Sequence, residues 1–226
     1  MSANESEVHA QVREIARRFT AEKLTPFAAA WDEQGGYPRE LVAEMGSLGF
    51  MGITVPEEWG GAGLDNLAGA IVLEEISAGS GSMGIIVSGH NAVGCMPILQ
   101  FGTQAQKDTY LRPFARGEQL TAFALTEPAG GSDVAKLRTR AERRNDRYIL
   151  NGTKQFITSG STADVALIFA TTDPDAPRGK GISGFIVPTD TPGYTVDRIE
   201  NKMGLKASDT CVISLDSVEV PFENRL

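Results

Sequence analysis

The sequence predicts an α+β chain in which an N-terminal all-α helical domain, residues 1–118, precedes an antiparallel β-barrel-like middle domain, residues 119–226. Apolar residues recur with the helical period of about 3.6 in the first half, and they alternate with period two after Leu120. Pro113 and Gly117 lie between the two patterns and favour the end of a helix there. The chain is 41% hydrophobic, so it holds enough apolar material for a core.

The helical half is predicted from apolar faces and from residues that begin helices. Pro38 suits the start of one helix, and Thr103 with Gln106 forms a capping box for a short helix that reaches Leu111. The predicted apolar faces are Val8, Val12, Ile15, Ala16 and Phe19; Leu41, Val42 and Met45; and Leu64, Leu67, Ala68, Ile71, Val72 and Ile76.

The second half is predicted to form strands joined by turns. Asn145-Asp146 is a hairpin signal, and Asn151-Gly152 is interpreted as a second turn. Residues 171–181 are rich in Pro, Gly and charge, which indicates an exposed loop. The predicted strands are residues 120–125, 139–142, 147–150, 155–157, 165–170, 182–187, 194–196 and 211–215. We therefore expect a sheet closed into a sandwich or barrel.

Composition excludes several classes of function. The net charge of −8 argues against nucleic acid or an anionic membrane surface as the main partner, although a local basic patch for a phosphate-bearing ligand is compatible with it. Cys95 and Cys211 form no CxxC, which favours a reducing compartment. His9 and His90 have no metal-binding spacing, so we expect no metal site.

The sequence also bears on membranes and targeting. The longest apolar stretches fall short of a membrane span, so we expect no membrane partner. Residues 1–10 show neither a secretory nor a transit pattern, and we expect a cytoplasmic protein.

Residues 79–84, GSGSMG, match the GxGxxG pattern of dinucleotide-binding loops. A dinucleotide-binding loop requires a strand before the motif, but the preceding segment carries Glu74 and Glu75 inside a helical pattern. No parallel βαβ series follows it. We therefore interpret these small residues as sites of close packing against a neighbour or a ligand.

Residues 123–133, FALTEPAGGSD, end an apolar run with residues that cannot continue a strand. Pro128 removes a backbone donor, and two glycines allow close approach of the backbone. Thr126, Ser132 and Asp133 can bind backbone groups or a ligand. Composition alone favours a polar surface turn over a ligand-cradling loop.

This stretch resembles the signature of the acyl-CoA dehydrogenase family. Three further segments resemble the family in the same order: residues 98–111, residues 151–158 with NGTKQFIT, and residues 202–221 with KMGLKASDT and VEVP. The resemblance covers nearly the whole chain, and four ordered motifs together are specific. It implies a helical domain followed by a β-barrel-like domain, and it implies FAD as cofactor.

The resemblance also implies which residues contact the flavin and the substrate. Backbone groups of the first motif and the Thr126 hydroxyl would bond the pyrimidine edge of the ring, where reduction places negative charge. Thr158 would donate near N5. Phe156 stands where the family commonly has Trp, which keeps an apolar wall but removes an N–H. The implied flavin residues are Phe123, Leu125, Thr126, Gly131, Ser132, Phe156, Ile157 and Thr158, and the implied substrate residues are Ser132 and His90.

Several of these residues also have purely structural interpretations. Phe123 and Leu125 can be core residues of a strand, and Thr158 can cap one. His90 can be a packed or hydrogen-bonded histidine instead of a ligand contact. For Glu127, beside a proline in a turn, capping or a surface contact is favoured over a role as catalytic base.

The chemistry implied by the resemblance is α,β-dehydrogenation of an acyl-CoA thioester, with electrons passed to an electron-transferring flavoprotein. The family places its glutamate base and its tetramer contacts in a C-terminal helical domain, which we expect beyond Leu226. No catalytic residue is assigned within residues 1–226, and we expect these residues alone to lack turnover and to hold FAD poorly. A flavin monooxygenase relative and a non-catalytic CoA-binding module of the same fold stay open as alternatives.

Overall fold

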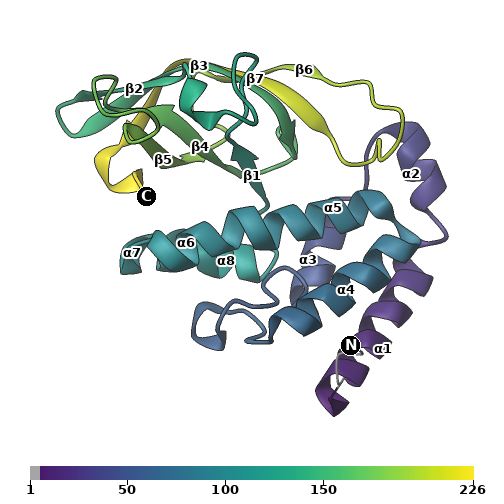
Figure 1. The fold of residues 1–226 in the computed structure, drawn as a ribbon. Helices are drawn as coiled ribbons and strands as arrows, with labels where there is room; N and C mark the ends of the chain where they lie inside the picture. The colour runs from purple at the N-terminus through teal and green to yellow at the C-terminus, as the bar shows by residue number, and fades with distance from the viewer. Residues whose placement is uncertain (1–5) are drawn as a thin grey trace.

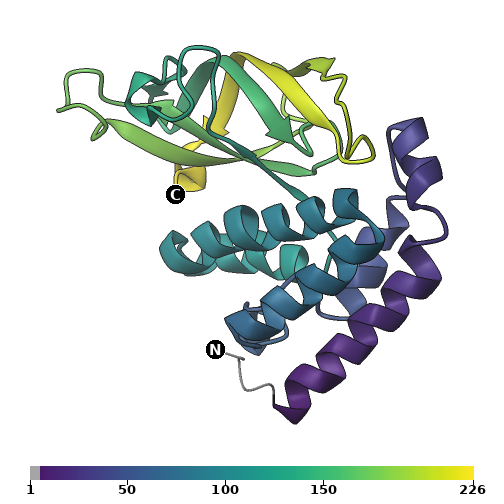
Figure 2. The ribbon, with the colours of Figure 1, turned by 45° about the vertical axis from the view of Figure 1, so that its right-hand side comes forward.

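A computed structural model describes residues 6–226 of the chain. A layer of helices lies beneath a curled sheet, and α5 is the helix next to the sheet (Figure 1). The same two layers are visible after a 45° turn (Figure 2). The first five residues, which fall in the predicted helical domain and in the segment without a secretory or transit pattern, lie outside the described residues.

Within residues 6–226, the helical layer is built from two longer helices, α1 and α4, several shorter ones and three π-helical turns. The helices are α1 (Glu7–Phe19), α2 (Ala28–Gln34), α3 (Glu40–Ser47), α4 (Asn66–Gly79), α5 (Gly81–Gly89), α6 (Met96–Phe101), α7 (Gln104–Gln106) and α8 (Arg112–Ala115). The π-helical turns are Thr20–Leu24, His90–Cys95 and Lys107–Leu111, and short 3₁₀ turns cover Glu57–Trp59, Val134–Lys136 and Phe222–Asn224.

The predicted start of α7 is confirmed, because Thr103 and Gln106 form a reciprocal capping box. The predicted apolar face of α1 is only partly correct. Ala16 and Phe19 are buried, but Val8 is 50% exposed. Since α1 packs mainly against α4 at the side of the layer, only a narrow stripe of it is covered.

The GSGSMG segment forms the junction of α4 and α5, and the packing interpretation is confirmed. A Cβ placed at Gly84 would lie 2.1 Å from the Ser77 hydroxyl of α4. At Gly79 it would lie 2.2 Å from the Thr20 side chain. The glycines therefore let these helices approach more closely than other residues would allow.

Gly81–Phe101 is one continuous helical stretch that runs through α5, a π-helical turn and α6. It is long and apolar enough to cross a membrane by length and composition, with a mean hydropathy of 1.3, so the expectation of shorter apolar stretches was wrong. Half of it is buried inside the protein, as in a core helix.

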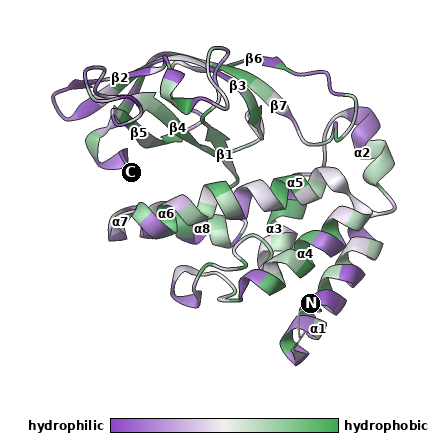
Figure 3. Ribbon diagram, viewed as in Figure 1, coloured by the Kyte–Doolittle hydropathy of each residue, from purple (hydrophilic) through white to green (hydrophobic). Residues whose placement is uncertain are grey.

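The seven strands found in residues 6–226 form one sheet. They are β1 (Thr121–Ala124), β2 (Arg140–Arg144), β3 (Arg147–Thr158), β4 (Val165–Thr171), β5 (Ile182–Pro188), β6 (Tyr194–Ile199) and β7 (Thr210–Pro221). Their order is β1-β4-β2-β3-β7-β6, with β5 on the other edge of β4. The interior-facing strands β4 and β5 are hydrophobic, whereas the tip of β2 is hydrophilic (Figure 3).

The sheet is mixed, which corrects the prediction of an antiparallel one. Strand β1 pairs with β4 in parallel, from Thr121 opposite Val165 to Ala124 opposite Ile168. Strand β2 then meets the same edge of β4, also in parallel, at Arg140 opposite Thr171. β1 and β2 thus act as one strand interrupted by residues 125–139, which leave the sheet and return.

The hairpin at Asn145-Asp146 is confirmed, since Arg144 pairs with Arg147 across it. The second predicted turn, at Asn151-Gly152, is wrong. β3 continues through it because β7 pairs on both sides, and the irregularity there is a shift of register. A second shift falls between Lys154 and Ile157 of β3. Neighbouring strand pairing overrides the local turn preference at Asn151-Gly152.

The two layers are fixed to each other by polar contacts as well as by packing. Asp164, just before β4, accepts a hydrogen bond from the Leu120 N–H at 2.7 Å and forms an ion pair with Arg39 beside α3. Asp32 of α2 accepts from the Ala207 N–H at 3.0 Å. These contacts hold the sheet against the helical layer.

Candidate functional site

A cavity of about 240 Å³ lies between α5 with its π-helical turn and the ends of two strands. The sheet side contributes Phe123 from β1, Thr126 just beyond it, and Phe156 and Thr158 from the end of β3. The helical wall contributes Ile85, Ile86, Gly89, His90 and Val93, and Thr121 and Ser159 complete the lining. The cavity therefore joins both halves of the chain.

Two irregularities in the sheet create this cavity. The chain leaves β1 after Ala124, and the Gln155 N–H holds the departing loop through the Thr126 carbonyl at 2.9 Å. Beside it, the register shift in β3 places Phe156 at φ +60°, a conformation that costs an aromatic residue free energy. The Phe156 side chain is 59% exposed, so packing within the described residues does not explain this conformation.

The cavity has the features that a planar heterocycle with a polar edge requires. Thr126 and Thr158 are half-buried, and within residues 6–226 neither hydroxyl has a hydrogen-bond partner. Two phenylalanine side chains supply apolar surface. A Cβ placed at Gly89 would meet no protein atom within 4 Å, so this wall is open. The residues present therefore fit an isoalloxazine ring.

The structure brings together some of the predicted site residues and not others. Phe123, Thr126, Phe156, Thr158 and His90 line the cavity. Of the remaining residues, Leu125 is half-buried beside Thr126, Ile157 is buried in the sheet core, and Gly131 and Ser132 are exposed on the loop without lining the cavity. A Cβ at Gly131 would lie 3.6 Å from Thr126, an ordinary contact distance.

His90 lies at the floor of the cavity with only 1% of its surface exposed. Its Nε2 donates to the Phe114 carbonyl at 2.9 Å, and its Nδ1 accepts from the Thr121 N–H at 3.3 Å. Burial lowers the pKa of the imidazole to about 4. This geometry matches the interpretation of His90 as a packed, hydrogen-bonded residue. A polar contact between this ring and the substrate stays a prediction.

Glu127 is buried and bonds backbone N–H groups, which matches the capping alternative and not the surface contact. It is 5% exposed, and its carboxylate accepts from the backbone N–H groups of Arg138 at 2.6 Å and Thr139 at 3.0 Å. The Lys154 ammonium also donates to it at 2.8 Å. Burial alone would raise the pKa of Glu127, but the three hydrogen bonds outweigh burial and lower it. A carboxylate with these partners is not free to act as a base.

Lys154 is the residue whose role sequence reasoning missed. It is fully buried in β3, where burial lowers the pKa of its ammonium and the bond to Glu127 offsets part of that shift. The signal was present in the alternation of β3, in which the inward positions Tyr148 and Leu150 are followed in phase by Lys154. A lysine at an inward position requires a buried acceptor.

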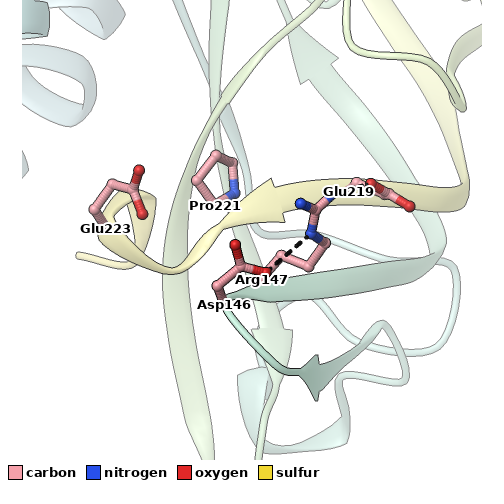
Figure 4. Close-up of a pocket in the computed structure, with 5 residues that line it drawn as sticks. All are labelled: Asp146, Arg147, Glu219, Pro221 and Glu223. Atoms are coloured by element: carbon pink, nitrogen blue, oxygen red, sulfur yellow. Dashed lines mark hydrogen bonds and ion pairs between the residues drawn. The ribbon is translucent and has the colours of Figure 1, made fainter.

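Another cavity, of about 340 Å³, lies at the opposite end of β3 (Figure 4). Its charged groups are Asp146, Arg147, Glu219 and Glu223. Arg147 is ion-paired with Asp146 at 3.3 Å and with Glu219 at 2.5 Å. These side chains are exposed, and Arg147, Asp146 and Glu219 are paired with one another. The described residues that line this cavity include no threonine and no aromatic residue, so this cavity is not the candidate site.

Comparison with known proteins shows the family of the chain. Residues 6–118 match the family profile described as acyl-CoA dehydrogenase, N-terminal domain, and residues 122–218 match the profile of the acyl-CoA dehydrogenase middle domain. The chain belongs to the acyl-CoA dehydrogenase family. The border between the two matched segments falls in the short connection between α8 and β1.

Individual relatives share the fold over almost the whole chain. An acyl-CoA dehydrogenase of Bacillus subtilis is 45% identical over 95% of this chain and 56% of its own length. The structure of butyryl-CoA dehydrogenase from Megasphaera elsdenii superposes with a TM-score of 0.93 at 37% identity, covering 100% of this chain and 60% of that one. An acyl-CoA dehydrogenase of Bacillus anthracis complexed with FAD gives a TM-score of 0.90 at 35% identity, covering 99% and 38%. The chain spans about half the length of the curated relatives that it matches.

Proposed function

We propose that the protein that carries this chain is an FAD-dependent acyl-CoA dehydrogenase, which removes hydrogen from the α and β carbons of an acyl-CoA thioester. The observation that supports this most directly is the pair of unpartnered hydroxyls, Thr126 and Thr158, beside an aromatic wall in a member of this family. When bound, FAD supplies the hydride acceptor for the β-hydrogen.

The residues of this chain act on the cofactor by position and by charge. The hydroxyls of Thr126 and Thr158 would donate hydrogen bonds where negative charge develops on reduction, and donors fixed in advance stabilise such charge without reorganisation. Phe123 and Phe156 would cover the ring and exclude water, which strengthens those hydrogen bonds. The buried, neutral His90 would keep the floor of the cavity rigid.

The base that removes the α-proton is proposed to lie in a part of the protein outside residues 6–226. Within the described residues, no carboxylate lines the cavity, and the oxygens of Glu127 have three donors already. General-base catalysis contributes about 10²- to 10⁴-fold, so residues 1–226 alone are expected to lack useful turnover.

The acceptor, assembly and location are further parts of the proposal. The family resemblance supports an electron-transferring flavoprotein as electron acceptor and a homotetramer as the complete assembly. The two free cysteines, both buried, are compatible with a cytoplasmic location.

The test uses the complete protein, purified, loaded with FAD and mixed anaerobically with a series of acyl-CoA thioesters while the flavin absorbance is followed. We expect bleaching by at least one thioester. Thr126→Val should slow this reduction by about 10²- to 10³-fold, the usual effect of losing one donor to a developing negative charge.

Thr195→Val is the matched control, because Thr195 is exposed on β6, away from the cavity lining. Equal reduction rates in wild type and Thr126→Val would contradict the role of Thr126. A colourless protein that still binds CoA thioesters would support a binding module, and product formed only with oxygen would support a monooxygenase.

A further inference from the structure

We propose that the buried ion pair of Glu127 and Lys154 is a positioning device, which closes the loop of residues 125–139 onto β3 and thereby sets where Thr126 stands relative to Thr158. The consequence for the flavin rests on the function proposed above. The positioning of the loop itself does not.

Glu127 joins the two ends of the loop. It lies three residues beyond β1, where the loop departs, and its two carboxylate oxygens accept the N–H groups of Arg138 and Thr139, where the loop returns to β2. The Glu127 side chain therefore connects the departing end of the loop with its returning end. β4 bonds this loop at its returning end, where the Thr171 N–H donates to the Thr139 carbonyl at 2.8 Å. The departing end, after β1, needs a further closure because its pairing with β4 stops at Ala124.

Lys154 attaches this closed loop to β3. Its ammonium donates to Glu127 Oε1 at 2.8 Å and to the Leu125 carbonyl at 3.1 Å, so it holds the loop at two points. One residue further along β3, the Gln155 N–H donates to the Thr126 carbonyl at 2.9 Å. These three bonds lie next to each other and all join the start of the loop to β3.

The two members of the ion pair lie near the two cavity threonines in the sequence. Thr126 immediately precedes Glu127, and Lys154 lies four residues before Thr158, on the near side of the register shift at Phe156. A displacement of the loop along β3 would therefore move Thr126 while Thr158 stays paired opposite Thr210 of β7. Hydrogen bonding to a ring demands placement within about 0.5 Å, so such a displacement would matter.

The burial of the pair favours positioning over stability as its role. Lys154 is 0% exposed, and Glu127 is almost as deeply buried. Desolvation makes a buried ion pair about neutral in stability compared with apolar groups of the same shape, whereas its directional hydrogen bonds select one geometry. Five bonds converge here on two side chains and the Thr126 carbonyl, so few alternative loop positions satisfy all of them.

The experiment compares the complete protein with the double variant Glu127→Gln/Lys154→Met, which removes both charges and nearly preserves side-chain volume. Backbone amide exchange is measured without flavin. We expect exchange in residues 125–139 to accelerate about tenfold or more while β4, β5 and β7 keep their protection. With FAD, we expect weaker flavin affinity, a changed reduction potential and a lower kcat with little change in KM for the thioester.

Arg147→Met/Glu219→Gln is the matched control, because it neutralises an exposed ion pair between the same strand β3 and β7. Unchanged exchange in residues 125–139 of the first variant would overturn the proposal, as would a uniform loss of protection across the whole sheet. If the double variant does not fold, Glu127→Gln alone must accelerate exchange at Arg138 and Thr139, and failure to do so also overturns it.

The two proposals fail separately. A wild-type protein that binds no flavin would overturn the proposed function, whereas the exchange measurement would still decide the role of the ion pair. A flavin-binding wild type together with a double variant of unchanged exchange and potential would overturn only the positioning role.

Discussion

At the scale of single residues, His90 shows how burial converts a titratable side chain into a structural one. Its two ring nitrogens connect the helical layer, at Phe114, with the first strand, at Thr121. The contact with Thr121 requires the neutral ring, since Nδ1 accepts a hydrogen bond there, whereas Nε2–H can donate to Phe114 in either protonation state. The groups whose charges act on the ring, Arg39 and Asp164, belong to an ion pair of their own.

His90 should make the folded protein less stable in acid. The pKa of the ring is about 4 in the folded state and near 6.5 when unfolded, so between these values the unfolded state binds a proton that the folded state does not. The free energy of unfolding therefore falls as the pH drops from 6.5 towards 4, by about 3 kcal/mol from this residue.

The measurement is urea unfolding of wild type and His90→Gln at pH 7, 5.5 and 4.5. The variant should be less stable at pH 7, because Gln cannot make both contacts, and it should lose less stability in acid than wild type does. The carboxylates titrate equally in both proteins, so the difference between the two pH dependences of stability is due to His90. Parallel pH curves would contradict the lowered pKa, because they would mean that the ring takes up its proton at the same pH in the folded and unfolded states.

At the scale of elements, the short connection between the two layers packs directly on the backbone of α3. A Cβ placed at Gly46 would lie 2.0 Å from the Arg116 carbonyl oxygen, and one at Gly117 would lie 2.3 Å from the Val42 carbonyl oxygen. Both neighbours are backbone atoms, which cannot turn aside as a side chain can.

Gly46→Ala should therefore destabilise the protein, although alanine favours helices elsewhere. We expect a loss of about 1–3 kcal/mol, typical of an extra methyl forced into a packed contact, and thermal unfolding measures it. Gly36→Ala is the control, because a Cβ at Gly36 meets nothing within 4 Å. A Gly46→Ala variant as stable as wild type would mean that α3 and the connection separate easily.

At the scale of the whole molecule, the connection between the halves is among the better protected parts of the surface. The N–H groups of residues 116–119 all donate to carbonyls of α8 and its neighbours, and Leu120 is buried. The loop of residues 172–181 is different, since most of it is exposed. The loop carries Arg178 and Lys180, and the connection carries Arg116, so trypsin can report on both.

Limited trypsin digestion should cut after Arg178 or Lys180 before it cuts after Arg116. A protease needs several residues of extended chain, and opening the connection requires breaking its hydrogen bonds and its packing on α3. Mass spectrometry of the first fragments tests this. Arg178→Gln/Lys180→Gln should delay the first cut, and a first cut after Arg116 would show instead that the layers come apart.

The sequence by itself determined the features that depend on neighbouring residues. The change from period 3.6 to period two locates the passage from helices to strands, because each period reflects one backbone geometry. The same holds for the capping box of Thr103 and Gln106 and for the hairpin at Asn145-Asp146. The motifs that resemble the family led to Thr126 and Thr158, which the structure brings to one cavity with Phe123 and Phe156.

The tertiary structure decided whatever depends on residues far apart in the chain. β1 pairs in parallel with β4, a segment far along the chain, and no local pattern records that pairing. Asn151-Gly152 lies inside a strand because β7 pairs through it. The burial of Glu127 with Lys154 and the use of both His90 nitrogens also arise only when distant segments meet. In each case, long-range pairing and desolvation outweigh the preference of the local sequence.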